Sequence, residues 1–247
     1  MLAGTARALA DSIARYGEEF PERIAASRAG EQLFLHTLDK RPEIDGYVDD
    51  WLLDPAAMKT LRGDDGPIRM AVATHDRMIY VYVDVSDRVP VFASADTMIL
   101  DDGPRFADRI TLVSSSPPYF DERIIFAAEA PGAIVSYRQD SYGFAPEPAI
   151  TAYWQDVPGG YRLEAQIPAE MLGTHLGFVV SNTTDANQRA TRISSYSGRQ
   201  PLPLVRPSAE LRSVAETLVQ PGMRILITDA AGWRVAKAGE LSESPSD

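Results

Sequence analysis

Cysteine is absent from this chain, which excludes disulfide bonds, thiolate metal sites and cysteine nucleophiles. Long apolar runs are also absent, since no stretch approaches the roughly 20 residues that a helix needs to cross a bilayer. Met1 is followed by an alanine-rich segment without the pattern of a signal peptide. We therefore expect the chain as it stands to be soluble, and its 45% hydrophobic content is enough for a buried core.

Basic residues are too few to balance the acidic ones. The 24 lysines and arginines stand against 35 aspartates and glutamates, which gives a formal net charge of −11. Such a chain repels phosphate backbones and anionic membrane surfaces. We therefore do not expect nucleic acid to be a partner.

The sequence motifs of common enzymes are missing as well. The chain has no Gly-x-Ser-x-Gly elbow, P-loop, His-Glu-x-x-His pair or dinucleotide fingerprint. Asp140 and Glu147 offer two carboxylates for hydrolysis, but their spacing in sequence does not fix the separation in space that determines a mechanism. We expect no enzymatic activity from this chain.

Short strand-like segments fill the middle of the sequence. Residues 68–74 and 78–86 are joined by a three-residue polar connection that suits a hairpin. Residues 161–167 alternate apolar and polar side chains, which indicates a strand with one wet face. Further expected strands are 31–38, 108–114, 123–130, 133–138, 150–157 and 177–182, with a helical turn at 55–62. This pattern is typical of sandwiches, so we predict a mainly β fold, an antiparallel, jelly-roll-like β-sandwich over residues 31–200.

Helices are predicted on both sides of the sandwich. Residues 1–30 should contain a helix, because one stripe of apolar side chains recurs at spacings of three and four: Leu2, Ala6, Leu9, Ile13, Tyr16 and Phe20. This helix is either an ordinary amphipathic helix on the domain or a membrane-proximal or dimer helix.

After a proline-rich connector at 196–207, residues 201–240 should form a helix and a small hairpin. Ser208 is placed to cap the helix, whose apolar positions are Leu211, Val214 and Leu218. The hairpin strands are expected at 223–229 and 233–238. The polar tail 241–247 is expected to be disordered.

One acidic motif, at residues 44–51, precedes most of these strands. Its Asp45–Gly46 pair favours a tight turn. Asp45, Asp49 and Asp50 could supply oxygen ligands to Ca²⁺, or serve the turn and cap backbone amides. Trp51, which closes the motif, is expected to be a core anchor with its N–H bonded to a neighbour. A second acidic cluster with the same two alternatives is formed by Asp101, Asp102 and Asp108.

Aromatic residues in the later strands are candidates for ligand contact. Trp154 is the one expected to be exposed, because it lies beside hydrogen-bonding groups such as Gln155. Tyr119, Tyr137 and Tyr142 lie in the loop-rich segment before it. Aromatic faces next to amides and carboxylates suit carbohydrate, whereas aromatic pairs across a sheet are usually packing.

The middle of the chain resembles the family 9 carbohydrate-binding modules and their DOMON-like relatives. The resemblance covers residues 33–197 and is carried by Ile44-Asp45-Gly46 with Asp50-Trp51, and by residues 71–73, 79–83, 107–112, 161–168 and 176–178. It implies a sandwich that recognises a ligand, with a glycan as the first candidate. Some DOMON-like proteins bind haem, which would place axial ligands among Met70, Met78, Met98 and His75. The alternative is core methionines and a turn histidine.

Taken whole, the flanking segments are similar to the sensor region of proteobacterial membrane histidine kinases associated with sortase systems. The resemblance implies a periplasmic, ligand-sensing domain that self-associates through its terminal helices and belongs to an inner-membrane two-component kinase. The chain lacks the kinase's membrane segments, phosphoacceptor region and nucleotide-binding boxes. The alternatives are a carbohydrate-binding module of a secreted protein and a haem-binding domain.

Overall fold

The computed structural model describes residues 32–53, 58–94, 107–116, 122–140, 143–183, 190–197, 200–229 and 233–239. These residues divide into two compact units. One is Leu33–Leu204, and the other is Gln32 together with the described part of Val205–Asp247.

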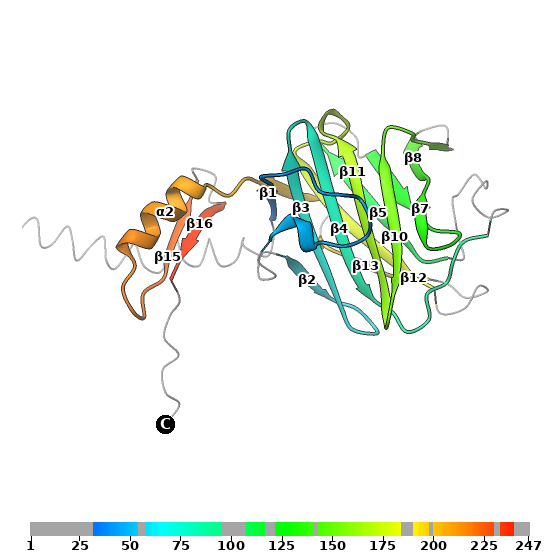
Figure 1. Cartoon of the computed structure of the whole chain (residues 1–247), viewed down its shortest axis with the longest axis horizontal. Helices are drawn as coiled ribbons and strands as arrows, with labels where there is room; N and C mark the ends of the chain where they lie inside the picture. Colours follow the sequence, from blue (N-terminus) through cyan, green and yellow to red (C-terminus); the bar gives the residue numbers. More distant parts are fainter. Residues whose placement is uncertain are drawn as a thin grey trace, which may run out of the picture. The chain divides into compact units, whose positions relative to one another are not determined.

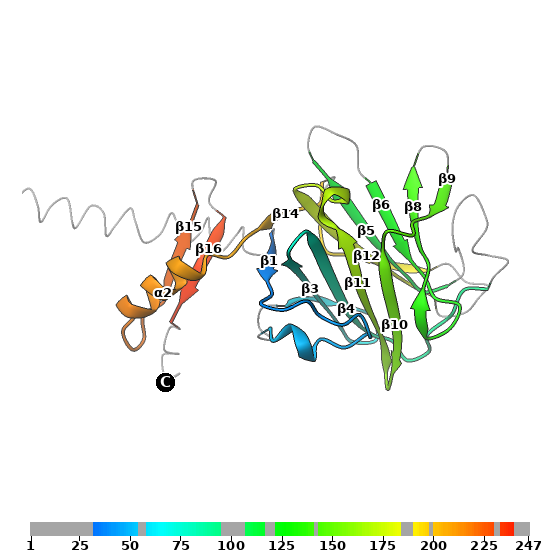
Figure 2. The same cartoon turned by 45° about the horizontal axis from the view of Figure 1, so that its top comes forward.

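In the larger unit, fourteen strands of the described residues are joined in one continuous sheet that folds over into two layers (Figure 2). The first layer contains β7 (Gly132–Ile134), β10 (Thr151–Val157), β11 (Gly160–Pro168), β4 (Met78–Ser86), β3 (Pro67–His75), β2 (Lys59–Arg62) and β1 (Leu33–Thr37). The second contains β14 (Leu202–Val205), β12 (His175–Asn182), β13 (Thr191–Ser194), β5 (Arg109–Ser115), β6 (Glu122–Phe126), β8 (Ser136–Asp140) and β9 (Gly143–Pro146). The neighbours β1 and β14 connect the layers. The prediction of a mainly β sandwich is confirmed.

The core lies between the two layers because each central strand turns alternate side chains inward. Val81 and Leu163 from the first layer and Phe126 and Phe178 from the second are all fully buried in one hydrophobic cluster. Burial of each such side chain stabilises the fold by roughly 1.5–3 kcal/mol. The pairing is antiparallel almost throughout, with β1 and β3 as a parallel exception.

The outer face of the first layer is covered by residues 38–53, which we call the covering segment (Figure 1). Near its end the segment forms η1 (Asp49–Trp51), and Trp51 packs its ring edge-on against Tyr80 and Tyr82, with ring centroids 6.2 and 6.1 Å away. The predicted role of Trp51 as a core anchor is confirmed, since only 3% of it is exposed and its Nε1–H donates to Glu164.

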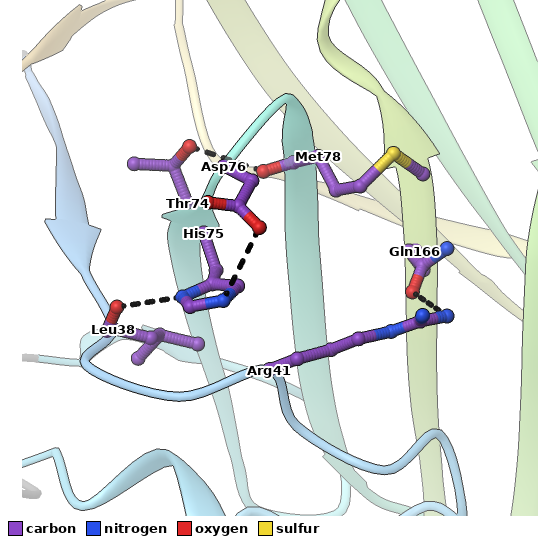
Figure 3. Close-up of polar contacts among 7 residues, drawn as sticks. All are labelled: Leu38, Arg41, Thr74, His75, Asp76, Met78 and Gln166. Carbon is purple, nitrogen blue, oxygen red and sulfur yellow. Dashed lines mark hydrogen bonds and ion pairs between the residues drawn. The ribbon is translucent and has the colours of Figure 1, made fainter.

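Polar contacts fix the other end of the covering segment to the same layer (Figure 3). Nδ1 of His75 donates to the carbonyl oxygen of Leu38 at 3.0 Å, and Arg41 Nη2 donates to Gln166 Oε1 at 3.1 Å. The segment is therefore held to both β3 and β11.

This cover corrects the prediction that β11 has one wet face. Glu164 and Tyr82, which point away from the core, are 0% and 2% exposed. The alternation of residues 161–167 does indicate a strand, and β11 forms there, but alternation carries no information about a loop that packs on the polar side.

The smaller unit packs α2 (Ala209–Leu218) against a hairpin of β15 (Ile225–Thr228) and β16 (Arg234–Ala238). Ser208 caps the helix by accepting from the Leu211 N–H at 3.2 Å, as expected. Ala215 is the buried contact of α2. The predicted helix and hairpin are confirmed, but the apolar positions of α2 are exposed, by 39% for Leu211, 54% for Val214 and 60% for Leu218.

Three local predictions are wrong. Residues 59–62, expected in a helical turn, form β2 as a partner of β3. Residues 202–205, expected in a connector, form β14 despite their proline. Residues 133–138, expected as one strand, divide into β7 and β8, which belong to different layers.

Among the residues that the structure describes, the remaining helical element is η3 (Ala169–Met171), which follows β11. The predicted segments 1–30 and 241–247 lie outside the described residues. No helix within the described residues is long and apolar enough to span a membrane.

Candidate ligand-binding face

The outer face of the second layer is hollowed, with a cavity volume of about 320 Å³. The hollow lies over β12, β5, β6, β8 and β9 and is also bordered by β13 and the residues after it. We call it the ligand face. Its side chains come from strand positions that alternate with those of the core, so they point away from the first layer.

Strand register brings the polar side chains of the ligand face into rows. One row crosses β5, β6, β8 and β9, because Val113 pairs with Arg123, Arg123 with Gln139, and Gln139 with Phe144. A row nearer the other end of these strands places Ser181 of β12 between Arg109 of β5 and Arg192 of β13.

Between these rows the floor of the ligand face is aliphatic. Ile125 is 4% exposed and Val179 is half-buried, and Val113, the aliphatic member of the first row, is 3% exposed. Thr111, the register partner of both Val179 and Ile125, is half-buried beside them. A buried aliphatic floor excludes water from polar groups at its border, which strengthens their interactions with a ligand.

Two half-buried aromatic residues lie at opposite sides of the ligand face. Phe144 is on β9, and Tyr196 lies over β12. Gly177 makes the place of Tyr196 possible, because a Cβ at this position would lie 2.4 Å from the Tyr196 ring. The strands β5, β6 and β8 separate β12 from β9, which corresponds to roughly 19 Å at about 4.8 Å per strand.

The ligand face is electropositive. Burial lowers the pKa of the Arg109 guanidinium, and the nearby charge of Arg192 lowers it further. Among the described residues that line the face, none is an aspartate or glutamate. The arrangement can therefore donate many hydrogen bonds and attract negative charge.

The ligand residues predicted from sequence do not form one site. The prediction that Trp154 is exposed is wrong, because it lies in the core with only 1% of its surface exposed. Its ring stacks on that of Tyr161, with the ring centroids 4.3 Å apart. Gln155 is on the first layer against Gly46. Tyr137 is on the second layer beside its register partner Ile125, at the border of the ligand face, where it packs against alanines. Tyr119 and Tyr142 lie outside the described residues.

The acidic motif serves backbone structure. Asp45 accepts from the Tyr47 N–H at 2.9 Å, and Asp50 accepts from the Glu43 N–H at 2.7 Å. Within the described ranges, no three histidine or acidic side chains are grouped so that they could hold a metal ion, so Asp45, Asp49 and Asp50 do not form the predicted calcium site.

Asp108 also has a structural role. It is buried and accepts from the Val91 and Thr183 N–H groups, each at 2.7 Å. Burial, with a smaller contribution from the neighbouring Asp87, raises its pKa to about 7. Its two predicted partners in the second acidic cluster, Asp101 and Asp102, lie outside the described residues.

The groups considered for haem are dispersed. Met70 faces the core, while His75 and Met78 lie on the covered face of the first layer (Figure 3). Both ring nitrogens of His75 are engaged, Nδ1 by Leu38 and Nε2 by Asp76 at 3.5 Å. These residues do not fit a haem group. Met98 lies outside the described residues.

Sequence reasoning missed the main residues of the ligand face: Arg109, Arg123, Gln139, Phe144, Arg192 and Tyr196. The signal that could have found them is the placement of arginines at outward positions of three strands in an acidic chain. The order of the strands was needed to see that these positions share a face.

No family model matches the sequence, and no curated protein matches it. Similar solved structures include a family 9 carbohydrate-binding module from Caldicellulosiruptor kristjanssonii in complex with glucose, at 16% identity and a TM-score of 0.44 over 72% of this chain and 97% of that one. The same kind of module from this organism in complex with cellotriose has 17% identity and a TM-score of 0.44, over 72% and 96% of the two chains. A protein from Bacteroides uniformis ATCC 8492 has 15% identity and a TM-score of 0.45, over 72% and 93%.

Proposed function

We propose that residues 33–204 are a carbohydrate-binding module and that the ligand face is its binding surface. The observation that carries the proposal is the composition of this face. Two half-buried aromatic rings, Phe144 and Tyr196, lie on either side of an aliphatic floor, with planar and hydroxyl hydrogen-bonding groups at its border.

This composition suits a saccharide because a sugar ring has two chemically different parts. Its faces carry C–H groups that pack on aromatic and aliphatic side chains, whereas its edge carries hydroxyl groups. The forked side chains of Arg123 and Gln139 can pair with neighbouring hydroxyls, and Ser181 and Thr111 offer single hydrogen bonds.

The lining residues favour binding without chemistry. Among those the structure describes, none is a carboxylate, histidine or cysteine, the side chains that most often act as general acids, bases and nucleophiles. The outer face of the first layer is a poorer candidate, because the covering segment occupies it.

The predicted sensor role in a histidine kinase, the periplasmic location and the self-association through terminal helices stay predictions, since the described residues do not test them. The proposal concerns the binding step, which these roles would share.

The test is a glycan array probed with the full chain, followed by calorimetric titration of the strongest saccharide. Phe144→Ala and Tyr196→Ala should each weaken binding about tenfold, because a stacked aromatic ring contributes roughly 1.4 kcal/mol. Tyr47→Ala is the matched control, since Tyr47 is 43% exposed but lies on the covering segment. The proposal is wrong if no saccharide binds, or if both variants bind as tightly as the control.

A further inference from the structure

We infer that the saccharide bound at the ligand face is an acidic one, and that Arg123 and Arg192 bind its carboxylate or sulfate groups. This inference rests on the proposed function and names the class of ligand. Although the chain has a formal net charge of −11, three arginines surround this one hollow.

Two of these arginines are positioned to repel each other. Arg109 and Arg192 are both register partners of Ser181, one on each side, so their side chains start from the same row of the same face. Their strands are separated only by β12, which places the backbones roughly 10 Å apart. A bound anion near this row would be attracted by both guanidiniums.

The third arginine lies toward the other end of the aliphatic floor. Arg123 pairs with Val113, which is four residues along β5 from Arg109 and therefore roughly 13 Å away along the strand. The floor of Thr111, Ile125 and Val179 lies between the two basic positions. This spacing suits a ligand whose acidic groups are carried by an extended backbone, as in an oligosaccharide of acidic sugars.

Several arginines outside the ligand face form ion pairs, in contrast to Arg123 and Arg192. Five of them pair with acidic side chains within 4 Å: Arg69, Arg88, Arg138, Arg162 and Arg212. Arg123 and Arg192 have no ion pair with any residue in the part of the chain that the structure describes, and both are exposed. They are therefore available to a ligand.

An acidic group is the partner that suits these guanidiniums. A carboxylate or sulfate accepts two parallel hydrogen bonds from one arginine and also neutralises its charge. A single neutral hydroxyl offers one acceptor oxygen, so it does not match the guanidinium fork, and it does not neutralise the charge. The overall negative charge of the chain disfavours non-specific adhesion of polyanions, so affinity for an acidic saccharide would report on this face.

The test compares a charged and a neutral form of one oligosaccharide. Calorimetric titration of the full chain with an oligogalacturonate of four sugars is set against the same oligosaccharide with its carboxyl groups methyl-esterified. We expect the acid to bind at least tenfold more tightly, with an affinity that falls as salt is raised from 50 to 300 mM. A sulfated tetrasaccharide is the third arm, and tighter binding of it would support the inference and identify the acidic group as sulfate.

Two substitutions locate the acid group. Arg123→Gln and Arg192→Gln should each weaken acid binding about tenfold or more and change ester binding less than twofold. Arg123→Lys and Arg192→Lys should recover part of the loss because they keep the charge. Arg88→Gln is the matched control, since Arg88 is exposed and pairs with Asp65 away from this face. Both positions on the face are exposed, and thermal melting checks that the variants fold.

The outcomes separate this inference from the proposed function. If saccharides bind in a manner that Phe144→Ala weakens, but acids have no advantage over esters, the acidic inference fails and the carbohydrate-binding function stands. If acids bind but the two glutamine variants behave like Arg88→Gln, the inference also fails. If no saccharide of any charge binds, both proposals are overturned.

Discussion

Replacing Glu164 by glutamine should change how the stability of this protein depends on pH. Glu164 is fully buried beneath the covering segment, where it accepts hydrogen bonds from Trp51 Nε1 at 2.8 Å and from the Asp45 and Gly46 N–H groups at 3.0 Å. Burial raises its pKa from 4.5 to about 7, although these hydrogen bonds oppose the rise.

The sign of the effect follows from this pKa. Between pH 4.5 and 7 the folded protein keeps a proton that the unfolded chain has released. The corresponding stabilisation is fully present below pH 4.5 and is lost as pH rises through 7. One unit of pKa difference corresponds to about 1.4 kcal/mol. The rise from 4.5 to about 7 therefore predicts that Glu164 lowers the free energy of unfolding by about 3 kcal/mol, most of it between pH 5 and 8.

The assay is urea unfolding followed by tryptophan fluorescence at pH 5, 6, 7 and 8. The Glu164→Gln variant should unfold more easily at every pH, because the NH₂ group of the glutamine side chain would face an N–H donor and leave it without an acceptor. Its free energy of unfolding should nevertheless fall less steeply as pH rises. Part of the slope should remain, because burial also raises the pKa of Asp108 to about 7. The exposed Glu170→Gln is the control. Parallel stability curves for Glu164→Gln and the wild type would refute the reasoning.

Three further changes test the packing. Gly46→Ala should destabilise the fold by about 2–4 kcal/mol in urea unfolding, because Gly46 has a φ of +88° and a Cβ there would lie 2.5 Å from Gln155 Cβ. Gly159→Ala is the control: Gly159 has a φ of +84° but open space around it, so the substitution should cost only about 1–2 kcal/mol. Equal losses would contradict the contact. Trp154→Phe should lower the melting temperature and leave saccharide affinity unchanged, because Trp154 is in the core; a selective loss of affinity would restore it as a ligand residue. Gly177→Ala should displace the Tyr196 ring and weaken binding in the calorimeter several-fold, and unchanged affinity would show that the ring's place does not matter.

The sequence allowed the sandwich to be predicted because β11 alternates apolar and polar residues, while β3 and β4 are mostly apolar and contain several β-branched residues; both signals are local properties. It allowed the role of Trp51 to be predicted because a tryptophan after an acidic turn usually anchors a loop. Proline at position 203 favoured a connector, yet β14 forms there, since a proline can occupy a strand position that makes no ladder bond.

The ligand face could not be predicted, because it depends on contacts between segments far apart in the chain. Arg109 and Arg192 are 83 positions apart in sequence, and only the pairing of β5 and β13 with β12 brings them to one row. Trp154 misled for the opposite reason. Its polar neighbours in sequence, Tyr153 and Gln155, point to the other side of the strand, so they carry no information about its own surroundings.

The adjacency of β1 and β14 has a consequence for engineering. Since the sandwich begins and ends on neighbouring strands, its two ends could be fused through a short linker and the chain reopened elsewhere, giving a circular permutant. The exposed turn at Pro158 and Gly159, between β10 and β11, is a suitable place for the new termini. A probe or a second domain attached there would leave from the first layer and keep the ligand face clear.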